Sequence, residues 1–205
     1  MRPGDRTSSA TTPNDSDWRE RRTVASAFSH ALVAMAMGKS FPRFILTWPV
    51  LIAGMACSIL PDLDVIGFHF GTQYGDLWGH RGLTHSLFFA GLLSAALVAL
   101  WDRRRPSVNK TALFCYLFLC TASHGVLDAM TNGGLGVAFF SPFDTTRYFF
   151  PIRPVAVSPI GIDEFFTEYG LQVLANEALW IWLPTGIALV ILRTLYRLTA
   201  PSAGG

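Results

Sequence analysis

The sequence has few charged residues and few cysteines. Only 15% of its 205 residues are charged, 51% are hydrophobic, and the formal net charge is +2. So small a net charge argues against nucleic-acid binding. The three cysteines, Cys57, Cys115 and Cys120, lie inside apolar stretches without CxxC spacing, which excludes a disulfide framework and a thiolate zinc site. The composition instead indicates a single membrane domain.

The two ends of the chain lack a periodic apolar pattern. Residues 1–22 are rich in Thr, Ser, Asp, Arg and Pro, which predicts a disordered tail. Residues 199–205 predict a flexible C-terminus. The part between them, residues 23–198, is the predicted membrane-embedded domain.

Apolar stretches predict an all-α integral membrane protein with about four to five membrane-embedded helices. The stretch 44–60 is free of charge over seventeen residues, which at ~1.5 Å per residue is marginally enough to cross a bilayer. Pro49 predicts a kink in it. The other stretches are 23–38, 83–101, 111–127 and 178–192. The short basic connection between 83–101 and 111–127 predicts that these two helices form an antiparallel hairpin.

Residues 23–38 allow two interpretations. The basic flank Arg19–Arg22 precedes them and would suit a signal peptide. Ser26, Ser29 and His30 interrupt the apolar stretch, which favours a retained helix.

Three further segments predict structure at the membrane surface. Residues 65–79 have an interfacial composition of Gly and aromatic residues, which predicts a loop at the headgroup level. Residues 131–161 contain two adjacent glycines and four prolines, so they predict an irregular, ordered lid. Residues 162–177 have apolar positions at helical spacing with acids between them, which predicts an interfacial helix.

The basic residues predict an orientation. By the positive-inside rule they mark cytoplasmic helix ends, so the opposite ends, which carry histidines and aspartates, meet on the outer side. The basic flank Arg19–Arg22 conflicts with this rule, because it would lie on the outer side if residues 23–38 spanned the membrane. A half-embedded or re-entrant helix at 23–38 would resolve the conflict. The basic residues that mark the cytoplasmic helix ends are Lys39, Arg43, those of the turn Arg103–Lys110, Arg193 and Arg197.

Histidine and aspartate gather next to the apolar stretches. His124 and Asp128 are four residues apart, so they share one face of a helix. The alternative is a helix-capping Asp and a His bonded to nearby backbone, but ionisable groups at membrane helix ends are costly and favour function. Neutral imidazole and carboxylate are ligands of Zn²⁺, Mn²⁺ and Fe²⁺, which predicts a membrane metal centre.

Asp62 and Asp64 follow a helix-ending proline. In an extended loop they would point to opposite sides, whereas in a turn both could reach one cation. The alternative is a pair of turn-forming aspartates.

His80 and His85 suit a turn that runs into a helix start, where Thr84 or Ser86 could cap. His30 stands alone in an apolar stretch, as either a core histidine or a ligand near the other clusters. His69 is left out of the site because it lies in the predicted interfacial loop.

Three arginines are candidates for contact with an anionic group. Arg81 lies between the two histidines and would neutralise a phosphate or anchor to a headgroup. Arg147 and Arg153 lie in the predicted lid, where they would bind an anionic substrate or extend to lipid headgroups.

These motifs resemble the YdjM-like family, whose members are described as LexA-regulated, inner-membrane-associated proteins with an inferred metal-dependent hydrolase activity. The resemblance covers roughly residues 29–161 and rests on a His in the first apolar stretch, Pro-Asp-Leu-Asp at 61–64, Gly-His-Arg-Gly-Leu-Thr-His-Ser at 79–86, Ser-His-Gly-Val-Leu-Asp at 123–128, and Ser-Pro-Phe at 141–143. The His-x-x-x-Asp pair is also similar to the helical zinc-dependent phospholipase C fold. The resemblance implies these metal ligands: His30, Asp62, Asp64, His80, His85, His124 and Asp128.

The sequence therefore predicts a multi-pass protein of the bacterial inner membrane that hydrolyses a phosphoester of a lipid or lipid-linked substrate. One or two divalent ions, Zn²⁺ first with Mn²⁺ or Fe²⁺ as alternatives, would activate water. Asp62 or Asp64 would act as general base, and Arg81 would offset negative charge. The alternatives are a non-catalytic metal-binding protein or transporter, and a scaffold whose polar clusters only cap helices.

Overall fold

The computed structural model describes residues 23–24, 26–40, 47–104, 109–159 and 167–199. The predicted tail 1–22 with its basic flank, Arg43, the first residues of the predicted 44–60 helix, residues 160–166 and residues 200–205 lie outside the described residues.

The described chain is helical, which confirms the predicted all-α class. The one pair of strands in it joins β1 (Thr23–Val24) to β2 (Ser158–Pro159) in antiparallel fashion. The helices are α2 (Ala27–Ser40), α3 (Trp48–Ile59), the 3₁₀ helices η1 (Leu60–Phe70) and η2 (Leu83–His85), α4 (Leu87–Asp102), α5 (Lys110–Ala129), α7 (Glu168–Glu177), the π-helical turn η3 (Ala178–Trp182) and α8 (Leu183–Thr199).

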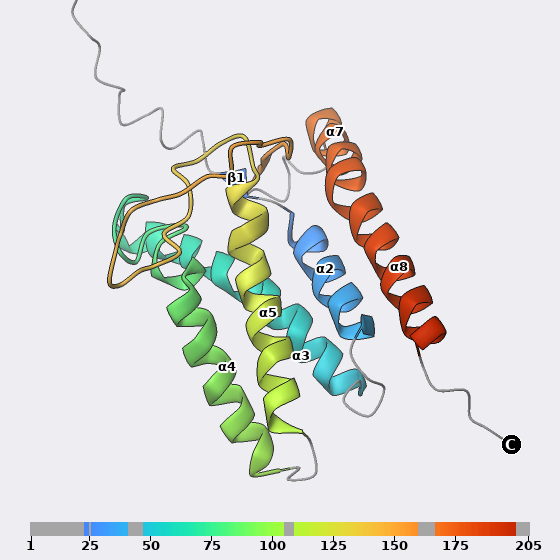
Figure 1. Ribbon diagram of the computed structural model, residues 1–205. Coiled ribbons are helices and arrows are strands. Elements are labelled where there is room, and N and C mark those ends of the chain that lie inside the picture. Colours follow the sequence, from blue (N-terminus) through green and yellow to red (C-terminus); the bar gives the residue numbers. More distant parts are fainter. Residues whose placement is uncertain (1–22, 25, 41–46, 105–108, 160–166, 200–205) are drawn as a thin grey trace, which may run out of the picture.

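The predicted hairpin of two apolar helices is α4 followed by α5, which lie side by side (Figure 1). Ser86 begins α4 as its N-cap and accepts a hydrogen bond from the Phe89 amide at 3.0 Å, as the sequence allowed. At the other end of the hairpin, Lys110 Nζ lies 2.7 Å from Asp102 Oδ2.

Helices α2 and α3 pack on α5 around one aromatic side chain. The buried Tyr116 donates from its hydroxyl to the Ala34 carbonyl at 3.2 Å. A Cβ at Gly54 would lie 2.2 Å from that hydroxyl, so glycine is what lets α3 approach so closely. This contact belongs to the main apolar core, away from the polar end of the bundle.

Three helical segments are long and apolar enough to cross a membrane, judged by length and composition. They are Trp48–Phe70, Lys110–Ala129 and Glu168–Thr199, and Leu87–Asp102 is a shorter apolar helix. The predicted four to five membrane-embedded helices thus correspond to three candidate spans in the described chain.

Two expectations about the segment after residue 44 are wrong. Pro49 lies in the first turn of α3 and produces no kink, because a proline there removes no intrahelical hydrogen bond. Residues 65–70 are not a loop: η1 continues from α3 to Phe70, where Gly71 adopts φ +85° and ends the helix. Residues 71–79 are turns, as predicted.

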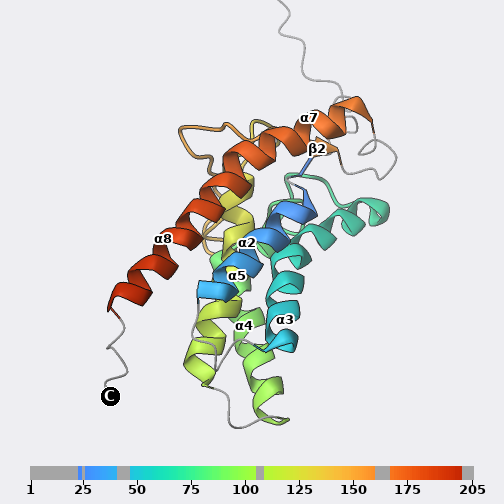
Figure 2. The ribbon, with the colours of Figure 1, turned by 90° about the vertical axis from the view of Figure 1, so that its right-hand side faces the viewer.

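The last two predicted helices are one. The described part of the predicted interfacial helix, α7, runs through η3 into α8 without interruption, and Figure 2 shows this long helix running alongside α2. Pro184 lies at the second position of α8, two residues after the last residue of the π-helical turn, Trp182. The wider turn accommodates a residue that would otherwise clash with the preceding carbonyls.

Residues 131–159 are irregular, as predicted for the lid: apart from strand β2 they contain only isolated bridges between Thr131 and Val155 and between Val137 and Tyr148. The lid is tied to the turn before η2, because the Ala138 amide donates to the Arg81 carbonyl at 3.0 Å. It lies at the same end of the bundle as η1 and the last turn of α5 (Figure 1).

Candidate metal centre

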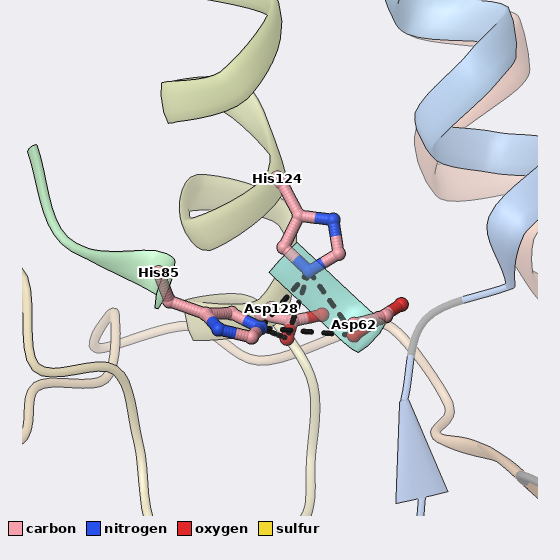
Figure 3. Close-up of side chains that lie close together, drawn as sticks. All are labelled: Asp62, His85, His124 and Asp128. Atoms are coloured by element: carbon pink, nitrogen blue, oxygen red, sulfur yellow. Dashed lines mark hydrogen bonds and ion pairs between the residues drawn. The ribbon is translucent and has the colours of Figure 1, made fainter. Parts of the chain in front are cut away.

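The polar clusters of the sequence come together at one end of the bundle. Asp62 comes from η1, His85 from η2, and His124 and Asp128 from the last turns of α5. Figure 3 shows these four side chains pointing toward one another. One ligand atom of each lies within 4.8 Å of all the others.

The separations of these atoms fit the coordination of one small ion. The two histidine Nε2 atoms are 3.0 Å apart. Asp62 Oδ1 lies 3.2 Å from His124 Nε2 and 3.7 Å from His85 Nε2. Asp128 Oδ2 lies 3.4 Å from His85 Nε2 and 3.7 Å from His124 Nε2. Ligand atoms around a tetrahedral Zn²⁺ are roughly 3.3 Å apart, given bonds of about 2.0–2.1 Å.

The hydrogen bonds on the far side of each imidazole decide what faces the centre. His124 Nδ1 lies 2.7 Å from the Ser58 carbonyl oxygen, which can only accept, so Nδ1 carries the hydrogen. His85 Nδ1 lies 3.2 Å from Asp64 Oδ2 and 3.0 Å from Thr84 Oγ1. With both Nδ1 atoms donating, both Nε2 atoms are left to coordinate an ion, the outer-sphere arrangement typical of metal-ligating histidine.

Four electron-pair donors therefore face one point in a buried place. His85, His124 and Asp128 have side chains with no exposed surface, and Asp62 is 15% exposed. Neither Asp62 Oδ1 nor either oxygen of Asp128 has a hydrogen-bond partner. Buried acceptors are normally satisfied, and a cation is the species that satisfies four of them at once.

The pKa of His85, which lies between the candidate spans, reflects the same concentration of negative charge. Burial alone would lower this pKa, but the neighbouring carboxylates of Asp128, Asp62 and Asp64 outweigh burial and raise the pKa well above its usual value. A dication would neutralise these carboxylates in place of the proton.

The two aspartates of the Pro-Asp-Leu-Asp motif reach different partners. A 3₁₀ helix has three residues per turn, so residues i and i+2 are about 120° apart around its axis. The side chains of Asp62 and Asp64 therefore point in different directions. Asp64 Oδ1 lies 2.7 Å from His80 Nδ1, and Oδ2 accepts from the Thr84 hydroxyl at 2.7 Å. Asp64, His80 and His85 also form a second possible cation group through their own ligand atoms.

The tight turn before η2 carries His80 and leads directly to His85 in η2. A Cβ at Gly82 would lie 2.4 Å from the Leu77 carbonyl oxygen, so only glycine allows the turn to close. Arg81 adopts φ +61° and its side chain is completely buried, with Nε 3.1 Å from Asp128 Oδ2.

His30 borders the centre from the first turn of α2. Its ring stacks on that of His124 with centroids 3.9 Å apart, and its Nε2 lies 3.7 Å from Asp128 Oδ1. Both of its ring nitrogens are buried without a hydrogen-bond partner. It is therefore placed beside the four donors rather than among them.

The two lid arginines are placed differently from Arg81. Arg147 donates to backbone carbonyls of His80 and Tyr74 at 2.9 and 3.0 Å, so its guanidinium holds the lid and the turn together. Arg153 is exposed, and its guanidinium lies 4.5 Å from the Phe149 ring centroid. Substrate binding by either arginine stays a prediction.

One buried carboxylate near the site was not recognised from the sequence. Glu177 of α7 accepts from the Ser26 amide at 2.7 Å, from the Ser29 hydroxyl at 2.7 Å and from the Ser26 hydroxyl. It therefore caps the start of α2, one turn from His30. The interrupting serines of the 23–38 stretch were the available signal, but the partner is about 150 residues away.

Comparison with known proteins identifies the family of this chain. The family model for the YdjM inner membrane proteins matches residues 26–200. The inner membrane protein YbcI of Escherichia coli (strain K12) is 36% identical over 163 residues, covering 78% of this chain and 92% of its own length. No solved structure gives a significant match. The chain belongs to the YdjM family of inner membrane proteins.

Proposed function

We propose that this protein is a metal-dependent hydrolase of the inner membrane that cleaves phosphoesters of lipids or lipid-linked substrates. The observation that carries the proposal is the convergence of two imidazole Nε2 atoms and two carboxylates on one buried point, with a buried guanidinium beside it. A divalent ion held there, Zn²⁺ first and Mn²⁺ or Fe²⁺ as alternatives, would supply a Lewis acid that activates water and polarises a phosphoryl oxygen.

The residues around the centre are assigned roles as metal ligands, general base and orienting group. His85, His124, Asp62 and Asp128 hold the ion, and His30 and His80 are its nearest further candidates if a second ion binds. Asp62 is the ligand residue nearest the surface, so its carboxylate is the better placed general base. Asp64 is occupied with His80, Thr84 and His85, which suits an outer role that orients His85.

Burial and charge distribution support a site at the outer membrane face. The donors lie toward one end of the spanning candidates, whereas Lys39, Lys110 and Arg197 lie at the opposite helix ends. Basic residues favour the cytoplasmic side. A transporter would need its ligands near the bilayer midplane and a route on both faces, so the one-sided placement favours a hydrolase.

The test begins with metal content. We expect the protein purified in lipid nanodiscs to hold at least one Zn²⁺, Mn²⁺ or Fe²⁺ per chain by mass spectrometry, and His124→Ala to lose it. His69→Ala is the matched control, because His69 is an exposed histidine of η1 outside the donor cluster.

The second part is release of phosphate or a phosphorylated headgroup from mixed lipid substrates. We expect release by the native chain and His69→Ala, and none after chelation or in His124→Ala. Metal binding without release would favour the non-catalytic alternative. Release that survives both chelation and His124→Ala would refute the proposal.

A further inference from the structure

A buried guanidinium next to the metal centre keeps one nitrogen unused. Arg81 directs Nε toward Asp128 and donates from Nη1 to the Gly133 carbonyl at 2.9 Å, while its Nη2 is buried without a hydrogen-bond partner. Its φ of +61° is rare for a residue with a side chain, and such strain concentrates at ligand clamps and active sites. The fold thus maintains an inward guanidinium with donor capacity to spare.

A second unused donor lies close to the first. The Tyr74 hydroxyl is buried and, although the Leu135 backbone is near, makes no hydrogen bond of ordinary geometry. Burial raises the pKa of Tyr74, so the phenol keeps its hydrogen. Leaving such a group unpaired is costly, which indicates a ligand that accepts hydrogen bonds.

The lid brings these two side chains under one exposed residue. Gly134 adopts φ +80°, and a Cβ there would lie 2.6 Å from the Tyr74 hydroxyl and 2.8 Å from Arg81 Nη1. Any side chain at this position would press on both donors. The glycine therefore keeps open the place where the hydroxyl and the guanidinium meet.

The surrounding charge is suited to an anion once a dication neutralises the carboxylates. The Arg147 guanidinium lies 5.7 Å from the centroid of the Tyr74 ring. Its bonds to backbone carbonyls leave its positive charge in place beside the phenol. Arg147 thus contributes charge rather than direct hydrogen bonds.

We propose that Arg81 and Tyr74, beneath Gly134, form a subsite for the phosphate group of the substrate beside the metal centre. The inference rests on the proposed function and assigns the residues that bind the phosphate group of its substrate. The unused Nη2 of Arg81 carries two N–H groups that can donate to phosphate oxygens, and the phenol donates to a further oxygen. The same chemistry fits a lipid headgroup or free phosphate.

The test measures phosphate affinity of the metal-loaded protein in phosphatidylcholine nanodiscs by calorimetry, independently of turnover. Tyr74→Phe removes a hydroxyl that holds nothing in the fold, so it should keep the metal and weaken inorganic phosphate binding about ten-fold. Tyr148→Phe is the matched control: this lid hydroxyl donates to the exposed Asp144 at 3.3 Å, and phosphate affinity should not change.

Gly134→Ala gives a second test, because its methyl group should weaken phosphate binding while the metal stays bound. Phosphate affinity unchanged within two-fold in both Tyr74→Phe and Gly134→Ala would overturn the subsite. Hydrolysis that continues in that case would leave the proposed function standing. Tyr74-dependent phosphate binding without any turnover would support the subsite and reject the proposed function.

Phosphate affinity measured in phosphatidylcholine nanodiscs with and without phosphatidic acid distinguishes a lipid headgroup from free phosphate as the ligand. Either ligand is compatible with the subsite. If a headgroup is the ligand, phosphatidic acid in the nanodisc should compete with inorganic phosphate, and Tyr74→Phe should weaken that competition. If free phosphate is the ligand, affinity should be the same in both compositions.

Discussion

Two candidate membrane-spanning segments, α5 and the α7–α8 helix, have similar apolar composition and opposite surroundings. Half of α5 is buried, including His124 and Asp128, whereas α8 has no buried residue. The buried share of the apolar window is 56% in α5 and 6% in the long helix. Because lipid is as apolar as these side chains, α8 needs no protein partner along most of its length. Packing, rather than hydropathy, separates the helix that carries the site from the helix that borders it.

The largest expected effect comes from the ligand on α5 that also pairs with a buried cation. Asp128→Asn removes a donor of the metal centre and leaves Arg81 buried opposite a neutral amide. We expect metal affinity to fall at least 100-fold and the free energy of unfolding to fall by about 3 kcal/mol. Equilibrium dialysis and thermal unfolding in detergent measure these changes. Asp144→Asn, at an exposed lid carboxylate, should leave both unchanged.

The next effect concerns the packing that holds α5 in place. Gly54→Ala would put a methyl group 2.2 Å from the Tyr116 hydroxyl, and a buried phenol cannot move away freely. We expect a loss of about 2 kcal/mol of stability, seen as a lower melting temperature in detergent. Gly91→Ala on α4 is the control, because open space surrounds that position. Equal stability of the two variants would mean that α3 does not pack on α5 as described.

A smaller effect is expected where the long helix joins the bundle. Glu177→Gln keeps the size of the side chain but weakens its bonds to Ser26 and Ser29. We expect about 1 kcal/mol less stability and greater deuterium uptake in the first turn of α2. Glu168→Gln, at the exposed start of α7, should show neither change. Unaltered exchange in α2 in both variants would contradict the capping role of Glu177.

The smallest effect should come from α8. Ile191 is 52% exposed, and no residue of α8 is buried. Ile191→Ala should therefore change stability by less than about 0.5 kcal/mol. Leu117→Ala on α5, at a fully buried position, should cost several times more in the same melting assay. If the two substitutions cost the same, the contrast between the helices would be wrong.

The sequence was enough to predict the helical class, the α4–α5 hairpin, the lid and the meeting of the distant His and Asp clusters. These follow from local patterns: long apolar stretches, prolines, and a four-residue spacing on one helix. It could not tell whether Asp62 and Asp64 share a cation, because their direction depends on the 3₁₀ geometry of η1. It also missed the joining of α7 to α8 and the partner of Ser26 and Ser29. Both depend on tertiary contacts and on a helical turn that no local signal specifies.

X-ray absorption spectroscopy of the metal-loaded protein tests the central claim most directly. If the four donors hold one ion, the spectrum should show two imidazoles and carboxylate oxygens at about 2.0–2.2 Å, and the imidazole contribution should decrease in His85→Ala. A spectrum of a fully hydrated ion, or one that His85→Ala leaves unaltered, would contradict the account.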